Sequence, residues 1–190
     1  MNERHEQVLG VMRALKDAHV GGCHPYLGGS YATNLALKLP QTAKDVDIFL
    51  LGFRNAATYA MVSQLENIFD EVVERTPEEV GERPPGESIY QIPKQWKLFT
   101  CSKGTESFDL IFLDTDVVGL VDTISCTLSS MIYSVNYSTE VLSLTTMSRR
   151  VLRDILATKE CVVYPARSTP KHLCKILKRV MVLGYTIKYQ

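Results

Sequence analysis

The sequence lacks the marks of several protein classes. Its five cysteines are odd in number, widely spaced and contain no Cys-x-x-Cys pair, which argues against a zinc site or a disulfide framework. No apolar run approaches the roughly 20 residues needed to span a bilayer. The charged start, MNERHEQVLG, has no apolar stretch of the signal-peptide type. We therefore expect a cytoplasmic protein with no membrane partner.

Net charge is also absent, because 21 Lys and Arg residues balance 21 Asp and Glu residues. The balance hides an uneven distribution: residues 148–190 contain ten basic residues and two acidic ones. With 190 residues, 45% of them hydrophobic, the chain can bury one full core or a compact head with a small appendage. A basic segment on an acidic body favours a polyanionic partner, although a solvated helix face would look the same.

Apolar spacing and turn residues predict an alternation of helices and strands. Helices are expected over residues 3–19, 31–39, 55–74, 117–133, 148–158 and 169–183. Strands are expected over residues 24–27, 46–51, 89–92, 97–101, 107–113, 141–144 and 161–164, with a loop over 76–88 and a hairpin turn at 102–104. This order predicts an α+β fold, with a core over residues 1–147 and a basic helical extension packed on it over residues 148–190.

The sharpest local feature is LGGSYATNLALKLPQTAKDVDIFL, residues 27–50. Asp45 and Asp47 lie on one apolar strand, and residues two apart in a strand face the same side. Their carboxylates would repel one another, and a hard divalent cation such as Mg²⁺ relieves that repulsion. The alternative is that the two aspartates mark a solvent-facing edge.

The glycine-serine turn before that strand is suited to a different ligand. Gly28, Gly29 and Ser30 open a predicted helix, so their backbone N–H groups and the serine hydroxyl form a cradle for phosphates. Lys44, beside the aspartates, is a candidate to steady a triphosphate. The alternative is a plain turn. An anion site next to a metal site is what triphosphate chemistry requires.

This stretch resembles the signature of the DNA polymerase β-like nucleotidyltransferases: paired glycines or Gly-Ser, a short helix, then Asp-hydrophobic-Asp. The resemblance implies a mixed sheet flanked by helices and a third carboxylate on a later strand. SFDLIFLD, residues 107–114, offers Asp109 in mid-strand, whereas Asp114 lies at the strand end and is expected to cap a helix. The family's chemistry implies two Mg²⁺ ions (or Mn²⁺) at Asp45, Asp47 and Asp109 and transfer of a nucleoside monophosphate from an NTP to a hydroxyl.

A second resemblance covers STPKHLCKILKRVMVLGYTI, residues 168–187. It is similar to the segment of bacterial-type tRNA nucleotidyltransferases and poly(A) polymerases that reads the incoming base. The matching positions are Pro170, Lys175, Lys178, Leu183, Gly184, Tyr185 and Ile187. The likeness implies an RNA or tRNA 3′ end as acceptor. Among the basic residues, Arg149, Arg150, Lys175 and Lys178 are candidate phosphate contacts, and we expect Arg149, Lys175 and Lys178 to bind the incoming nucleotide.

The chain departs from this second pattern where the base is read. Thr169 and His172 stand in place of the family's Asp and Arg, so the protein template for C and A is missing. Two other classes therefore stay open. One is a nucleotidyltransferase acting on a small-molecule or protein hydroxyl; the other is a decayed transferase acting as a binding or inhibitor protein. The basic segment argues against the first, and the three carboxylates argue against the second.

Overall fold

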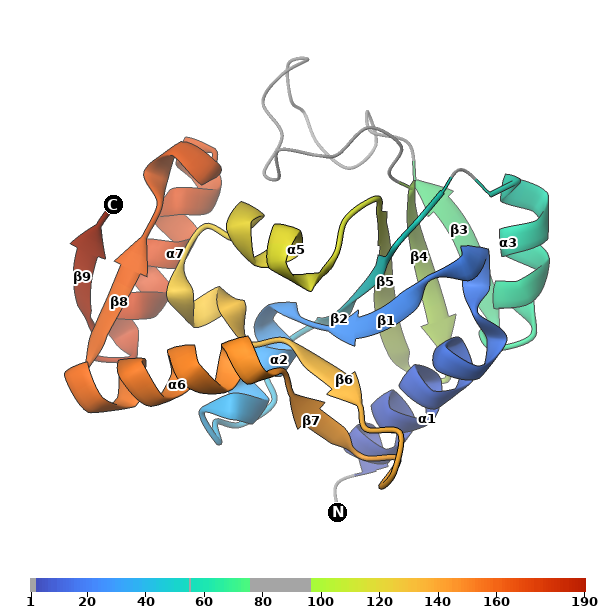
Figure 1. Ribbon diagram of the computed structural model, residues 1–190, viewed down its shortest axis with the longest axis horizontal. Helices are drawn as coiled ribbons and strands as arrows, with labels where there is room; N and C mark the ends of the chain where they lie inside the picture. Colours follow the sequence, from blue (N-terminus) through green and yellow to red (C-terminus); the bar gives the residue numbers. More distant parts are fainter. Residues whose placement is uncertain (1–2, 55, 76–96) are drawn as a thin grey trace.

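A mixed seven-stranded sheet forms the centre of the computed structural model, which describes residues 3–54, 56–75 and 97–190 (Figure 1). The strands lie in the order β3-β4-β5-β2-β1-β6-β7. Their bounds are β1 (His24–Leu27), β2 (Asp45–Leu51), β3 (Glu71–Arg75), β4 (Lys97–Lys103), β5 (Glu106–Leu113), β6 (Tyr133–Val135) and β7 (Leu142–Leu144). Of the paired neighbours described in this sheet, β2 and β5 run parallel and the others antiparallel.

Helices cover the sheet because β2 and β5 are apolar on both faces. Alternate β2 residues point to opposite sides: Ile48 and Leu50 join one hydrophobic cluster, and Phe49 joins the other. The α-helices are α1 (Glu3–Ala18), α2 (Gly29–Ala36), α3 (Thr58–Glu66), α5 (Val117–Thr123), α6 (Thr146–Thr158) and α7 (Pro170–Val182). Short 3₁₀ turns are η1 (Val20–Gly22), η2 (Thr127–Ser130) and η3 (Pro165–Arg167). Among the described helices, none is long and apolar enough to cross a membrane.

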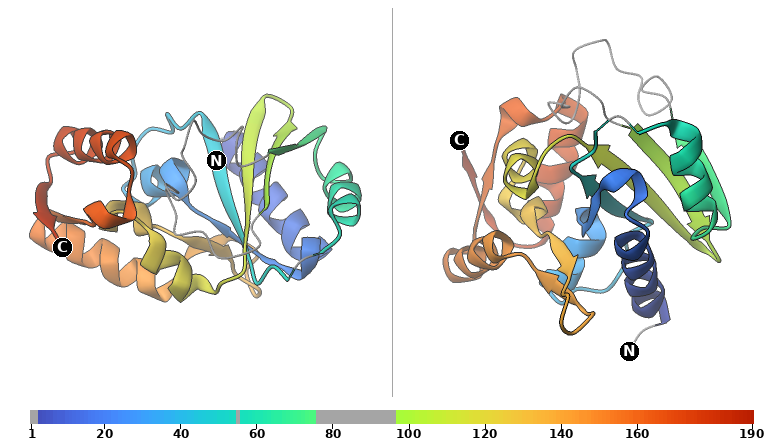
Figure 2. Two further views of the ribbon diagram at one scale, coloured as in Figure 1. Left: turned by 90° about the horizontal axis from the view of Figure 1, so that it is seen from above. Right: turned by 45° about the vertical axis from the view of Figure 1, so that its right-hand side comes forward.

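The last part of the chain builds a smaller unit beside the sheet. Strands β8 (Glu160–Val163) and β9 (Thr186–Tyr189) pair in parallel, and α7 connects them. Figures 1 and 2 place this unit at one end of the molecule and α3 at the other. A third hydrophobic cluster joins the unit to the body, since Cys126 and Leu128 pack with Ile176 and Val180. The helix α7 is thereby fixed against the segment that contains η2.

The α+β fold class, with a mixed sheet flanked by helices, is confirmed, but several element boundaries are wrong. The predicted helix over 55–74 ends at Glu66, and residues 71–75 form strand β3, where Val72 pairs with Cys101. The predicted helix over 117–133 ends at Thr123. Strands β6 and β9 were not predicted, so residues 148–190 are not purely helical. The predicted loop over 76–88 and strand over 89–92 lie outside the described residues.

Candidate functional site

The turn between β1 and α2 brings backbone very close to the Asp47 side chain. The Gly28 N–H donates to the Asp47 carbonyl oxygen at 2.9 Å. Gly29 has a φ of +63°, and a Cβ at this position would lie 1.7 Å from Asp47 Oδ2. Only glycine satisfies both the left-handed backbone and the close approach. The paired glycines therefore allow a carboxylate to sit against the start of α2.

The Asp47 carboxylate is surrounded by groups that shift its pKa in opposite directions. The pKa of Asp47 is raised to about 6, first by burial and then by the nearby carboxylates of Asp109 and Asp45. The Lys175 ammonium and the Ser30 backbone N–H, which donates to this carboxylate, act in the opposite direction. The charged form is therefore disfavoured by its surroundings, and a bound cation would stabilise it.

Asp109 stands beside Asp47 on the neighbouring strand. The parallel register of β2 and β5 pairs Asp47 with Asp109 and Asp45 with Ser107. Because directly paired residues share a face of the sheet, and residues two apart along a strand do as well, all three aspartates lie on one face. Burial raises the pKa of Asp109, and Asp45 contributes to the rise. The Thr100 hydroxyl donates to Asp109 Oδ1 at 2.9 Å, and this hydrogen bond opposes the rise in the pKa of Asp109.

The donor chemistry of this face suits a hard divalent cation, since carboxylate oxygens are the ligands that Mg²⁺ prefers. Within residues 3–54, 56–75 and 97–190, however, no three His, Cys, Asp or Glu side chains are arranged closely enough to hold a metal. Two of the carboxylates already have protein donors: the Ser30 N–H for Asp47 and the Thr100 hydroxyl for Asp109. The ligand types fit, and side-chain rotation would be needed to gather them.

Helix α7 supplies a cationic wall opposite this face. Arg179 Nη1 donates to Ser30 Oγ at 2.9 Å, and Arg179 Nη2 donates to Asn34 Oδ1 at 2.8 Å. Lys175 lies one turn earlier on the same helix, close enough to lower the pKa of Asp47. Sequence reasoning missed Arg179. The only signal was its helical spacing of four from Lys175, which places both on one face.

A cavity of about 280 Å³ lies between the start of α2, strand β2 and α7. We call it the α2–α7 cavity. Its described lining residues are Gly29, Ser30, Asp47, Phe49, Ile124, Ser125, Cys126, Leu128, Ser129, His172, Lys175, Ile176, Arg179 and Val180. The volume is close to the lower end of the range for small-molecule sites, about 300 Å³. The wall combines one carboxylate, two cations, serine hydroxyls and an apolar side.

The structure brings together some of the residues predicted from the sequence and leaves others apart. Gly29, Ser30, Asp47 and Lys175 line the α2–α7 cavity. The other two aspartates, Asp45 and Asp109, share the sheet face of Asp47. Gly28 is buried behind the turn, because a Cβ there would lie 2.4 Å from the Phe49 ring.

Four predicted phosphate contacts lie elsewhere. Lys44 and Lys178 are exposed and do not line the α2–α7 cavity, and Arg149 and Arg150 line a separate one. At the base-reading positions, His172 lines the α2–α7 cavity, whereas Thr169 Oγ1 accepts from the His172 N–H at 3.3 Å and caps α7. Thr169 is therefore engaged in holding the helix start.

Comparison with known proteins identifies the fold. No family model matches the sequence, and no curated protein matches it. Among solved structures, a Thermotoga maritima CCA-adding enzyme complexed with tRNA has a TM-score of 0.63 at 12% identity, covering 99% of this chain and 40% of that chain. A tRNA-processing enzyme has a TM-score of 0.60 at 15% identity, and the match covers 99% of this chain and 45% of that chain. A Bacillus stearothermophilus CCA-adding enzyme in complex with CTP has a TM-score of 0.51 at 14% identity, and the match covers 99% of this chain and 42% of that chain.

These matches confirm the predicted nucleotidyltransferase-type fold, resembling the head and neck of the tRNA nucleotidyltransferases. The likeness extends over 99% of this chain, including the C-terminal unit with α7, β8 and β9. The chain spans less than half the length of the solved structures it matches. At 12–15% identity the likeness establishes the fold, and the activity has to be argued from the site.

Proposed function

We propose that this chain transfers a nucleoside monophosphate from an NTP to a hydroxyl at the 3′ end of an RNA. The observation that carries the proposal is the pairing of Asp47 with Asp109 on parallel strands, beside the Gly29–Ser30 turn. We also propose residues 1–147 as the catalytic core and residues 148–190 as its extension. The fold shared with CCA-adding enzymes supports this reading.

The α2–α7 cavity supplies the groups that an NTP requires. Backbone amides at the start of α2 attract phosphate oxygens. Lys175 and Arg179 add positive charge from the opposite wall. Phe49, Ile124 and Leu128 give the cavity an apolar side, which suits the face of a base. One of the solved structures with this fold is a complex with CTP, which supports the choice of ligand class.

The reaction forms a bond between the acceptor oxygen and the α-phosphorus and breaks the bond from that phosphorus to the pyrophosphate oxygen. Two Mg²⁺ ions (or Mn²⁺), held by Asp45, Asp47 and Asp109, would supply charge neutralisation and a lowered pKa for the acceptor hydroxyl. The residues of the chain position the triphosphate and offset the charge that develops on the pyrophosphate. Lys175, whose ammonium lowers the pKa of Asp47, is placed for that second task.

An RNA acceptor is supported by the charge of residues 148–190, where ten basic residues accompany two acidic ones. One solved structure with the same fold is complexed with tRNA. The choice of nucleotide should differ from the ordered C, C, A series. Thr169 caps α7, and the His172 ring cannot reproduce the fork of hydrogen bonds that an arginine offers.

The decisive experiment incubates the protein with each labelled NTP, Mg²⁺ and an RNA pool that includes a trimmed tRNA. Label transfer to RNA with pyrophosphate release is the expected result. The matched controls are Asp47→Asn and Asp109→Asn, which keep the side-chain shape and should lose transfer by at least about 100-fold. Faithful addition of C, C and A would contradict the expected base selection but leave the transfer reaction in place.

A binding protein built on a transferase fold is the second candidate, because two geometric observations favour it. Arg179 donates to the Ser30 hydroxyl, and the described residues contain no ready group of three metal ligands. Calorimetric titration with an NTP and Mg²⁺ separates the two candidates. NTP binding without label transfer to RNA, protein or small hydroxyl acceptors would select the binding protein. Transfer to a protein or small-molecule hydroxyl alone would select the other transferase class.

A further inference from the structure

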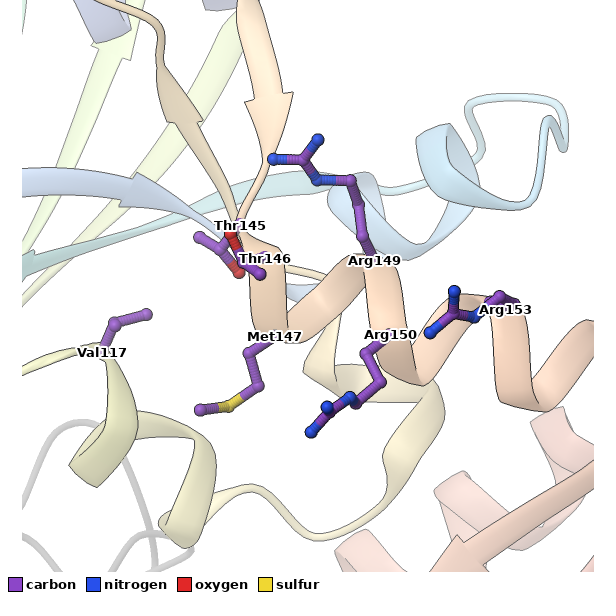
Figure 3. Close-up of a pocket in the computed structure, with 7 residues that line it drawn as sticks. All are labelled: Val117, Thr145, Thr146, Met147, Arg149, Arg150 and Arg153. Atoms are coloured by element: carbon purple, nitrogen blue, oxygen red, sulfur yellow. The ribbon is translucent and has the colours of Figure 1, made fainter.

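A second cavity, larger than the first, lies at the start of α6. Its volume is about 870 Å³, and its described lining residues are Val117, Thr145, Thr146, Met147, Arg149, Arg150 and Arg153. We call it the arginine cavity. It shares no described lining residue with the α2–α7 cavity. Figure 3 shows Met147 and Arg150 directed toward the space beside α5, whereas the Arg149 side chain points to the other side of α6.

The three arginines of this cavity are free to bind a ligand. Arg149, Arg150 and Arg153 are exposed. Within the described ranges, no hydrogen bond or ion pair joins the guanidinium group of any of them to another residue, whereas Arg4 is paired with Glu106 and Lys188 with Glu160. Arg149 and Arg153 are like charges four residues apart on α6, and such pairs repel one another on a helix. An anionic ligand would remove that repulsion.

The shape of the cavity favours a chain of phosphates over a single nucleotide. It is about three times the volume of the α2–α7 cavity, 870 Å³ against 280 Å³. Arg149 and Arg153 are four residues apart on α6, which separates them by about 6 Å along the helix axis. That spacing is of the order of the distance between successive phosphates in a nucleic-acid strand. Arginine is suited to phosphate because its fork donates two parallel hydrogen bonds.

The arginine cavity is rigidly connected to the proposed catalytic site. Ser148, between Met147 and Arg149 on α6, is fully buried. Its hydroxyl donates to the Ser130 carbonyl oxygen at 2.7 Å and accepts from the Ile132 N–H at 2.9 Å. Ser130 ends η2, whose residues Leu128 and Ser129 line the α2–α7 cavity. A molecule held on α6 is therefore fixed in position relative to that cavity.

We infer that the arginine cavity binds the phosphodiester backbone of the RNA acceptor, outside the NTP site. The inference rests on the proposed function, since it assigns the surface that holds the RNA while its 3′ end enters the α2–α7 cavity. It places Arg149 on the RNA, whereas the sequence had suggested a contact with the nucleotide.

The test compares the double variant Arg150→Gln/Arg153→Gln with Arg13→Gln/Arg54→Gln, which removes the same charge elsewhere. The ligand is a fluorescein-labelled RNA hairpin with a single-stranded 3′ tail, and binding is measured by anisotropy at several salt concentrations. We expect the α6 variant to weaken binding about tenfold or more. It should also reduce the slope of log K against log salt by about 1–2, because each phosphate contact contributes roughly 0.7–0.9 to that slope.

Two further measurements separate this inference from the proposed function. NTP binding and transfer to a trinucleotide acceptor should be unchanged in the α6 variant, because neither needs the arginine cavity. Loss of RNA binding in a protein that transfers nothing would uphold the arginine cavity and reject the transferase. Equal RNA affinity of the α6 variant and its control would overturn the inference, as would competition by polyglutamate as effective as that by unlabelled RNA.

A labelling experiment keeps the test valid if the double variant is unstable. Met147→Cys is introduced with Cys174→Ser, since Cys174 is the exposed cysteine in the described chain. The RNA hairpin should slow maleimide alkylation of the new cysteine at least about fivefold, because Met147 lines the arginine cavity. An alkylation rate unaffected by saturating RNA would overturn the inference.

Discussion

Arg179 and Ser30 are 149 positions apart in the sequence, yet Arg179 Nη1 lies 2.9 Å from Ser30 Oγ. The same guanidinium reaches Asn34 Oδ1 at 2.8 Å. These contacts tie α7 to the first turns of α2 and set the width of the α2–α7 cavity. Because the arginine bonds a hydroxyl of the proposed phosphate cradle, it contributes both to stability and to the site.

Replacing Arg179 should loosen this connection. Arg179→Met removes hydrogen bonds from a charged donor and leaves Asn34 without its partner, so the free energy of unfolding should fall by about 1–3 kcal/mol. Arg179→Lys keeps the charge but not the fork, and its loss should be intermediate. Urea denaturation measures both. Lys178→Met is the control, since Lys178 is exposed and should change stability by no more than about 0.5 kcal/mol.

Gly29→Ala should be far more damaging than Gly22→Ala. Both glycines have positive φ, +63° and +73°, so both variants carry a backbone strain of about 1 kcal/mol. At Gly29 the added methyl would also lie 1.7 Å from Asp47 Oδ2, whereas at Gly22 nothing lies within 4 Å. Thermal melts and transfer assays of the two variants make the comparison. Equal melting temperatures would show that the Asp47 carboxylate is not held against the turn.

The Asp47 carboxylate should make stability depend on pH. Its pKa is raised from 3.8 to about 6 in the folded protein, so its neutral form stabilises the fold below about pH 4. That contribution is lost as the pH rises toward 6 and above. In EDTA, Asp47→Asn should therefore be more stable than wild type at pH 7.5, by about 1–3 kcal/mol, with the gain disappearing near pH 4. Asp17→Asn, at an exposed position, should show no such gain.

A divalent cation should offset the loss of stability that the charged Asp47 carboxylate causes. At a tenfold excess over its Kd, Mg²⁺ or Mn²⁺ should add about 1.4 kcal/mol to stability, which corresponds to a rise in Tm of roughly 3–6 °C. Asp47→Asn and Asp109→Asn should each remove most of the rise. Differential scanning fluorimetry with and without EDTA measures it. A shift of the same size in wild type and both variants would assign the metal effect to other residues.

Much of the fold could be predicted because the sequence patterns that indicate it lie within short stretches of the chain. The Gly28–Ser30 turn and the alternating aspartates of β2 define an anion site and a carboxylate face within one short stretch. The pairing of Asp47 with Asp109 was accessible only through the resemblance, since strand neighbours are set by tertiary packing. Arg179 was missed for the same reason, because its partners lie on α2.

The errors in secondary structure have a physical cause as well. Met61, Leu65, Phe69 and Val72 follow helical spacing, yet the helix ends at Glu66. Val72 and Val73 are β-branched, and pairing with β4 outweighs the helical pattern there. Strand β9 was missed because its residues alternate weakly, and it forms only where β8 offers a parallel edge.

The great sequence separation of Ser30 and Arg179 has a consequence for folding. Their contact closes one of the longest loops in the chain, and the entropy cost of closure grows with loop length. The β1–β2 pairing and the β4–β5 hairpin join residues much closer in sequence. A pathway that forms local contacts first assembles the carboxylate face before α7 docks. On such a pathway, the face that carries the aspartates forms before the opposite wall of the α2–α7 cavity, so the binding site is completed late.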